Sequence, residues 1–405
     1  MGNGFVGVFS IFVLLAIVLP ACYLYLIAFA SFRNRNTEPS AQPKTRFAIA
    51  IPAHDEETVI GRTVGTLREL DYPADLYDVF VVADHCSDRT ADNARAAGAV
   101  CWERKEGARG GKGAALDWLF SHIFDAGRSY DAVVVFDADT VVDAKFLRLM
   151  DTRLKDGAPV VQGRHRIVNP RDAWFAALTW AMFIVDNRFQ NLGRANLGWS
   201  AKIMGDSICF RADILRHLGW GEGLTEDYEF RQKLLLEGIK IQYEPAAIGY
   251  GEAPANWSIA RAQRARWLSG TFRASRQYAR EMLVNGLRRR DTALLDGALQ
   301  AYLPSYSTLT LLAVSGLGLN VLFANWVGTL PLYSWLVLVV LLGVYPLIGL
   351  ALERAPGRAY LAIWLGPLFI LWRTALGVSA RFRREQVKWV RTPRRAGFQA
   401  DRLEK

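Results

Sequence analysis

An almost uncharged apolar run, Phe5 to Phe32, constrains the fold of this chain more than any other feature. The run is about 28 residues long, and a helix of about 20 residues already crosses the hydrocarbon layer of a bilayer. Basic residues follow the run, at Arg33, Arg35, Lys44 and Arg46, whereas a cleaved signal peptide has positive charge in front. We therefore expect a membrane helix with its N-terminus outside and the following chain in the cytoplasm.

The composition predicts membrane helices together with a water-soluble domain. The chain has 405 residues, 51% of them hydrophobic, and a net charge of +10 at pH 7. Basic residues concentrate between Arg261 and Arg290 and between Arg381 and Arg395, beside apolar segments. Such runs are more typical of an anionic membrane surface than of nucleic acid, so we expect membrane lipids and no nucleic acid as partners. The four cysteines lack the spacing of a zinc site, which predicts reduced thiols.

Alternating strand and helix patterns after this run predict an α/β domain with a parallel, doubly wound sheet. The predicted strands are Phe47 to Pro52, Val79 to Ala83 and Ala132 to Phe136. The predicted helices between them are Glu57 to Leu70, Thr90 to Gly98 and Lys112 to Phe124.

The strand Ala132 to Phe136 ends in two acids, Asp137 and Asp139. Ligands of parallel sheets gather at the carboxyl ends of the strands, and side chains two apart on an extended chain point the same way. The pair could share one Mg²⁺ or Mn²⁺ ion and leave coordination positions open for phosphate oxygens. Two solvated turn carboxylates remain the alternative.

Polar residues also follow the first two strands. Ala53 and Glu56 lie after the first, and Asp84 ends the second, where an acid commonly hydrogen-bonds a ribose hydroxyl. Each could instead serve only to cap a helix.

A glycine-rich basic loop, Arg109 to Gly113, opens the next helix. It is not a phosphate-binding P-loop, because Gly113 stands where that motif has Ser or Thr. A diphosphate contact by Lys112 and a plain glycine turn both remain open.

Two later segments carry further candidates. Thr225 is a natural N-cap, and Glu226 and Asp227 suit the helix dipole, but a carboxylate there could also act as a general base. Gln263, Arg266 and Trp267 lie at helical spacing. Arginine pairs with phosphate and tryptophan stacks on sugars, although a helix lying in lipid headgroups would have the same residues.

Four motifs in this order resemble those of the membrane-embedded family 2 glycosyltransferases, which include cellulose, hyaluronan and chitin-oligosaccharide synthases and ceramide glucosyltransferase. The motifs are Asp84, Asp137-x-Asp139, Thr225-Glu226-Asp227 and Gln263-x-x-Arg266-Trp267, and the resemblance covers roughly Phe47 to Gly270. It implies a GT-A fold, a nucleotide-diphospho-sugar donor that is usually UDP-linked, a divalent metal, and inversion at the anomeric carbon.

The resemblance also implies roles for individual residues. Asp139 would bind the metal together with Asp137, and Asp227 would deprotonate the acceptor hydroxyl. The donor would be bound by Ala53, Glu56, Asp84, Lys112, Asp137, Gln263 and Arg266. The acceptor would be bound by Trp267, with Asp206 and Glu226 as further candidates. Asp206 departs from the small uncharged residues usual in that region, so the acceptor stays open.

We expect two more membrane spans, Ala298 to Phe323 and Leu332 to Leu350. Ala359 to Ala380 is predicted to be interfacial or re-entrant, because Arg373 at the centre of a membrane would be costly. The predicted domains are a transmembrane helix (1–33), a cytoplasmic GT-A domain (46–255), an amphipathic interfacial segment (256–296), two transmembrane helices (297–352), and an interfacial helix with a basic tail (353–405).

The sequence thus predicts a multi-pass enzyme of the inner (plasma) membrane with a cytoplasmic catalytic domain. It would be an inverting glycosyltransferase acting on a lipid-linked or glycan acceptor in exopolysaccharide or glycolipid synthesis, with homo-oligomers or polysaccharide-assembly proteins as further partners. The alternatives are a processive β-glycan synthase and a catalytically inactive membrane scaffold.

Overall fold

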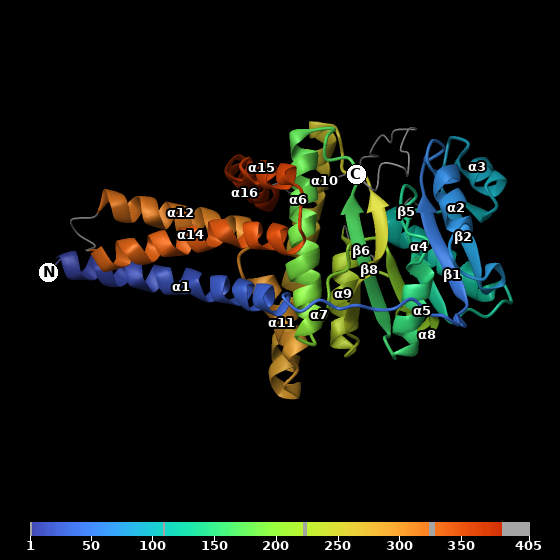
Figure 1. Cartoon of the computed structure of the whole chain (residues 1–405), viewed down its shortest axis with the longest axis horizontal. Coiled ribbons are helices and arrows are strands. Elements are labelled where there is room, and N and C mark those ends of the chain that lie inside the picture. The colour runs from blue at the N-terminus through green and yellow to red at the C-terminus, as the bar shows by residue number, and fades with distance from the viewer. Residues whose placement is uncertain (1, 108–109, 222–224, 324–328, 383–405) are drawn as a thin grey trace.

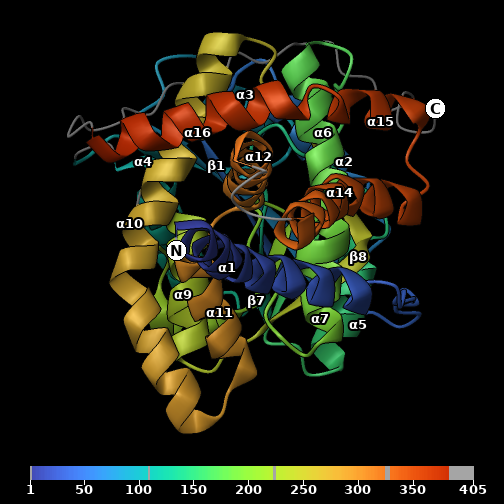
Figure 2. The same cartoon turned by 90° about the vertical axis from the view of Figure 1, so that its left-hand side faces the viewer.

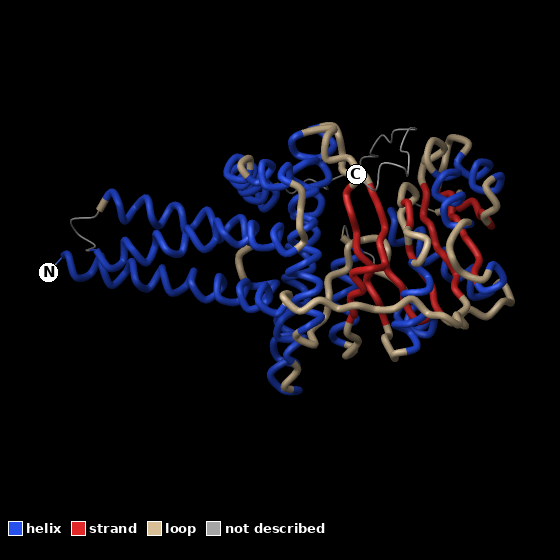
Figure 3. The backbone as a smooth tube through the Cα atoms, viewed as in Figure 1, coloured by secondary structure: helices blue, strands red, loops and turns tan. Residues whose placement is uncertain are grey.

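The computed structural model describes residues 2–107, 110–221, 225–323 and 329–382. Arg109 of the predicted glycine loop and nearly all of the predicted basic tail therefore lie outside the described residues. Three long helices lie side by side at one end of the molecule and an α/β domain forms the other end, with further helices between them (Figure 1). The strands are all in the α/β end (Figure 3).

The α/β domain contains an eight-stranded sheet in the order β3-β2-β1-β4-β7-β6-β8-β5. Its strands are β1 (Phe47–Ala53), β2 (Tyr77–Asp84), β3 (Val100–Arg104), β4 (Ala132–Val135), β5 (Val141–Val142), β6 (Val160–Ile167), β7 (Ile208–Arg211) and β8 (Ile241–Gly251). The predicted parallel pairing is confirmed for β1 with β2 and β4. Beyond β4 the sheet is mixed, because β7 pairs antiparallel with both β4 and β6.

Helices cover both faces of this sheet. Residues of β1 alternate between two cores, with Phe47, Ile49 and Ile51 in one and Ala48 and Ala50 in the other, because successive side chains of a strand point to opposite faces. The first core contains α2 (Ile60–Arg68), α3 (Thr90–Ala96) and α5 (Phe146–Lys155). The second contains α4 (Gly111–Asp125), α8 (Ala212–Leu218) and α9 (Glu226–Leu236).

The long helices α1 (Gly2–Ala30), α12 (Tyr306–Leu322) and α14 (Thr329–Leu352) share a separate apolar core. Two helices in the described residues are long and apolar enough to cross a membrane, at Ser10–Ala30 and Pro331–Leu352. Two bent pairs raise the number to at most four. They are α11 (Thr292–Tyr302) with α12, bent by 56°, and α15 (Gly357–Ile363) with α16 (Gly366–Phe382), bent by 50°.

The predicted span Ala298 to Phe323 is not one straight helix, because the chain bends by 56° between α11 and α12. Pro304 lies at the break, where a proline has no backbone N–H to continue the helix. Ser305 then starts the second helix and accepts a hydrogen bond from the backbone N–H of Thr308 at 3.4 Å.

A layer of helices lies between the sheet and the long bundle. It consists of α6 (Trp174–Asp186), a π-helical segment (Asn187–Gly193), α7 (Arg194–Asn196), α10 (Trp257–Arg289) and α11. Viewed along the bundle, α6, α10 and α16 run across the direction of α1, α12 and α14 (Figure 2). Within the layer, Arg194 of α7 and Asp296 of α11 form a buried ion pair at 3.0 Å. The Tyr23 hydroxyl of α1 donates to Asp296 at 2.6 Å and so connects the bundle to the layer.

Candidate active site

The site candidates Ala53, Asp84 and Asp137 lie at the ends of three neighbouring strands. In the sheet, β1 lies between β2 and β4, and all three run in the same direction, so their carboxyl ends meet at one edge. The sheet therefore brings the predicted nucleoside and metal candidates together. The side chain of Asp137 is 41% exposed and Asp139 is buried.

Lys112 connects the acidic pair to a second loop. Its Nζ, in the first turn of α4, donates to the carboxylate of Asp137 and to the backbone carbonyl of Gly205. Burial lowers the pKa of Lys112, but the carboxylates of Asp137 and Glu226 outweigh this effect, so its pKa is raised. A charged ammonium is therefore held beside the acid predicted to face the donor.

Glu226 and Asp227 occupy the first turn of α9. Asp227 Oδ1 accepts a hydrogen bond from the backbone N–H of Tyr228 at 2.8 Å, and burial raises the pKa of Asp227. Burial and the charge of Asp227 raise the pKa of Glu226 to about 7. Acids with raised pKa values are suited to accept a proton near neutral pH.

Gly205 brings its loop close to Asp227. A Cβ at Gly205 would lie 3.5 Å from Asp227 Oδ2, and the residue has φ of +91°, which glycine adopts at no steric cost. The Gly205 carbonyl accepts a hydrogen bond from Lys112. The loop therefore lies next to both Lys112 and Asp227.

Asp206, the next residue of this loop, has a buried side chain. Its Oδ1 lies 2.8 Å from His165 Nδ1, and its Oδ2 accepts from the Thr140 hydroxyl at 3.1 Å. Burial raises the pKa of Asp206, but the charge and hydrogen bond of His165, with other nearby groups, together have a larger effect, so the pKa of Asp206 is lowered. Burial lowers the pKa of His165, but the charge and hydrogen bond of Asp206, with other nearby acids, together have a larger effect, so the pKa of His165 is raised. This placement suits a residue that positions the loop.

Gln162 holds the same loop from β6. Its Nε2 donates to the carbonyl of Asp206 at 2.9 Å, and its Oε1 accepts from the backbone N–H of Met204 at 3.0 Å. Sequence reasoning missed Gln162 and His165, both of which are polar residues of β6. For Gln162 the available signal was a polar residue directly after two apolar valines of the same strand.

The nucleoside candidates have local partners. Asp84 accepts from Arg104 Nη1 of β3 at 2.6 Å, and the backbone N–H of buried Glu56 donates to the Thr90 hydroxyl at 2.8 Å. The Ala53 carbonyl faces the thiol of Cys86, 3.6 Å away. Arg104 was also missed, because β3 was not predicted.

Asp137 and Asp139 fit a divalent cation by their chemistry, since both offer the hard carboxylate oxygens that Mg²⁺ and Mn²⁺ prefer. A second group of metal-ligand side chains, His54, Asp55 and Cys86, has ligand atoms within 4.8 Å of one another. Burial raises the pKa of Cys86, which disfavours the thiolate that a metal requires. All four cysteines are free, as predicted.

The segment with Gln263, Arg266 and Trp267 lies on α10, which packs directly on the start of α9. A Cβ at Gly270 would lie 2.5 Å from Thr225 Oγ1, so only glycine allows this approach. The charge of Arg266 offsets part of the rise in the pKa of both Glu226 and Asp227, so its guanidinium lies close enough to act on these acids. The expected side-chain cap by Thr225 is not formed; its side chain packs against α10 instead.

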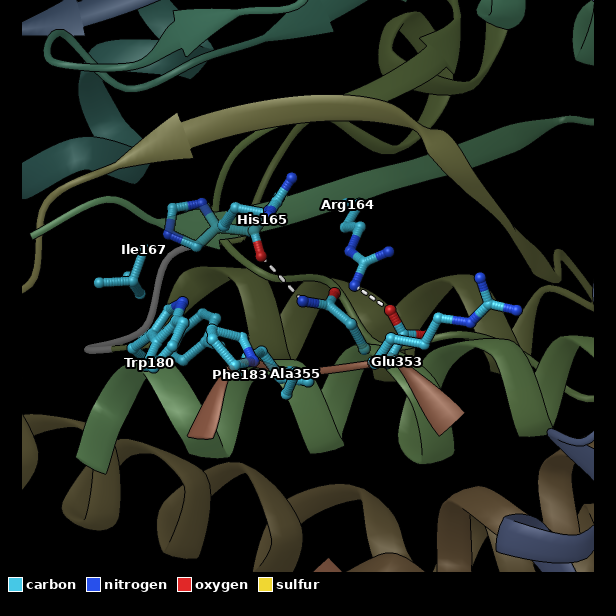
Figure 4. Close-up of a pocket in the computed structure, with 12 residues that line it drawn as sticks. Arg164, His165, Ile167, Trp180, Phe183, Glu353 and Ala355 are labelled. Carbon is cyan, nitrogen blue, oxygen red and sulfur yellow. Dashed lines mark hydrogen bonds and ion pairs between the residues drawn. The ribbon is translucent and has the colours of Figure 1, made fainter. Parts of the chain in front are cut away.

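A pocket of about 110 Å³ lies between this site and the end of α14. Figure 4 shows His165 of β6 over Trp180 and Phe183 of α6, and Arg164 pointing at Glu353. Arg164 forms an ion pair with Glu353, directly after α14. The ring of His165 contacts Asp206, and its neighbour Arg164 pairs with Glu353. β6 therefore links the loop of Gly205 and Asp206 to the end of α14.

The chain is similar to known proteins both in sequence and in structure. Residues 43–270, more than half of the chain, match the family model described as Glycosyltransferase like family 2. Probable glycosyltransferase YdaM of Bacillus subtilis is 24% identical over 371 residues, which cover 86% of this chain and 87% of that protein. Beta-monoglucosyldiacylglycerol synthase of Trichormus variabilis is 28% identical over 296 residues, covering 70% of this chain and 61% of that protein.

A solved structure shows the same fold. Mannosyltransferase PcManGT from Pyrobaculum calidifontis, in complex with GDP-Man and Mn²⁺, superposes with a TM-score of 0.60 at 17% identity, covering 92% of this chain and 99% of that one. The predicted α/β fold of the GT-A type is thereby confirmed.

Proposed function

Because this chain belongs to the glycosyltransferase-like family 2, we propose that it transfers a sugar, with inversion, from a nucleotide-diphospho-sugar to an acceptor at the membrane surface. The observation that carries the proposal is the position of Lys112, which hydrogen-bonds both Asp137 and the loop against Asp227. A cation for the leaving group and a base for the nucleophile thus adjoin one another, as direct displacement requires.

In this reaction Asp227 accepts the proton of the acceptor hydroxyl. The hydroxyl oxygen forms the new bond to the anomeric carbon as the bond from that carbon to the diphosphate breaks, and the diphosphate keeps the electron pair. Burial raises the pKa of Asp227, which suits a base. Lys112 and Arg266 bear the charges that balance the diphosphate.

The other predicted residues complete the donor and acceptor sites. Asp137 and Asp139 would hold Mg²⁺ or Mn²⁺, which supplies positive charge at the diphosphate when bound. Ala53, Glu56 and Asp84 would bind the nucleoside. Gln263 would join Arg266 at the diphosphate and Trp267 would stack on the acceptor sugar, whereas Glu226 and Asp206 position the acceptor side from below the surface.

The protein is membrane-associated, and we propose that α1, α12 and α14 cross the bilayer with the α/β domain in the cytoplasm. Their common direction, with α10 and α16 running across it, supports this arrangement (Figure 2). Basic residues in α10, such as Arg273, Arg276 and Arg280, suit an anionic cytoplasmic leaflet. A lipid acceptor is supported by the relative named as a glucosyldiacylglycerol synthase.

The test is a donor screen on the purified full-length protein in lipid vesicles, across UDP- and GDP-sugars with Mn²⁺ or Mg²⁺. We expect release of nucleoside diphosphate from one donor and incorporation of its sugar into a vesicle lipid. Product length on a gel distinguishes single transfer from the processive alternative. Failure to release nucleotide from any donor would favour the inactive scaffold and overturn the proposal.

A further inference from the structure

Two arginines from different helices lie beside the membrane bundle, next to Trp267, and have no role in the transfer step proposed above. Arg264 Nη2 of α10 donates to the Thr179 hydroxyl at 3.0 Å, and Arg373 Nη1 of α16 donates to the Ser305 hydroxyl at 2.9 Å. Both partners are neutral. Among the residues that the structure describes, neither guanidinium forms an ion pair, whereas buried Arg194 is paired with Asp296.

The two like charges act on each other. Burial and the charge of Arg373 lower the pKa of Arg264 to about 10. Asp186 of α6 is the acid that opposes this shift. The site therefore holds two cations close enough to repel, with one acid nearby, and a bound anion would relieve the repulsion.

The position of Arg373 adds a third positive feature. Its partner Ser305 is the N-cap of α12, a helix of 17 residues. The N-terminal end of a helix carries partial positive charge and exposed N–H groups, so a cation there is disfavoured and an anion favoured. Both arginines and the helix end thus select negative charge.

The surroundings are aromatic, which indicates what kind of molecule brings the anion. The Arg264 guanidinium lies 4.8 Å from the Trp267 ring centroid and 5.7 Å from that of Phe369. Phe369 contacts Trp372 at 5.4 Å between centroids, and Trp372 contacts Trp257 at 4.6 Å. Clustered tryptophans beside arginine are typical of the headgroup level of a membrane. An anion with an apolar body fits this site better than free phosphate does.

We propose that Arg264 and Arg373 bind the phosphate group of an anionic membrane lipid beside Trp267. The proposal goes beyond the transfer reaction and does not depend on it, because binding is measured without a sugar donor. The phosphate could reach the same arginines from a lipid or from solution, so the experiment separates these sources.

The test uses full-length protein in neutral detergent, titrated with fluorescent phosphatidic acid and followed by anisotropy. We expect Arg264→Gln and Arg373→Gln each to weaken binding about tenfold or more, because each loses a charged hydrogen-bond donor. The control is Arg211→Gln, an exposed arginine of the α/β domain that pairs with Asp213, which should bind as the unaltered chain does. The charge-conserving Arg264→Lys should keep most of the affinity, which separates a lost charge from a misfolded protein.

Two results would overturn the proposal. One is equal lipid affinity in the unaltered chain and both glutamine variants. The other is displacement of the lipid by millimolar inorganic phosphate together with equal binding of phosphatidylcholine, which would assign the arginines to a soluble anion. Retained lipid binding in the presence of inorganic phosphate supports the membrane source.

Discussion

The imidazole of His165 lies 2.8 Å from the carboxylate of Asp206, in the loop that also contains Gly205. The two residues are 41 positions apart, on β6 and on the loop before β7. Asp206 is buried and His165 is partly buried, and the Asp206 backbone carbonyl accepts a hydrogen bond from Gln162. A charge pair beneath the site thus fixes the loop that Lys112 and Asp227 share.

This pair should make stability depend on pH. The pKa of His165 is raised, so its contribution is complete below about pH 6.5 and is lost as pH rises through its raised folded-state pKa. The pKa of Asp206 is lowered, so its contribution is complete above about pH 3.9 and is lost as pH falls further. Asp206→Asn should remove both dependences in thermal unfolding followed from pH 2 to 9, a range that covers both titrations. An unchanged pH dependence would contradict the pairing.

Lys112→Gln should move the acid limb of the activity profile to higher pH. A general base works only when deprotonated, and Lys112 lowers the otherwise raised pKa of Asp227. Removing the cation therefore raises that pKa, and kcat/KM should fall off at a higher pH. Lys105→Gln is the control, since Lys105 is 70% exposed and paired with Glu103. If the pH profiles of Lys112→Gln and the unaltered enzyme superimpose, Lys112 does not lower the pKa of Asp227 and the prediction is contradicted.

Gly270→Ala should reduce activity although alanine favours helices by about 1 kcal/mol over glycine. The added methyl group would lie 2.5 Å from Thr225 Oγ1 and push α10, with Arg266, away from Asp227. Gly65→Ala in α2, where no atom lies within 4 Å, should be neutral or stabilising. Equal activity of the two variants in a transfer assay would contradict the close packing of α10 on α9.

Asp296→Asn should destabilise the protein by about 3–5 kcal/mol, because it leaves Arg194 charged and buried without its partner. Chemical denaturation in detergent measures this loss. Asp213→Asn removes an exposed ion pair to Arg211 and should change stability by less than about 1 kcal/mol. A similar small effect at Asp296 would mean that the buried pair does not hold the helical layer.

Local patterns predicted much of this molecule. The run Ala132 to Phe136 is apolar and ends in acids, so both the buried strand and the position of Asp137 follow from neighbouring residues. The family expected from four ordered motifs is confirmed. Pro304 was visible within the span predicted from hydropathy, and its effect on the helix is also local.

Other features depend on residues far apart in the chain. The direction of β7 is set by pairing with β4 and β6, and no pattern within Ile208–Arg211 encodes it. The two-residue strand β5 is too short for a period to be recognised. The partners of Asp206 and the contact of Gly270 with Thr225 likewise arise only when distant elements pack.

The central claim is that Asp227 is the base and that Asp139 serves the donor. Asp227→Asn should lower turnover by about 10² to 10⁴ while the Kd for nucleoside diphosphate with Mn²⁺ stays within about twofold, whereas Asp139→Asn should weaken that Kd itself. Glu229→Gln is the control, a carboxylate in the same turn that accepts from the Tyr278 hydroxyl at 3.1 Å. The most direct measurement is single-turnover transfer by Asp227→Asn at saturating donor: we predict its near-complete loss with donor still bound, and transfer at the unaltered rate would contradict the account.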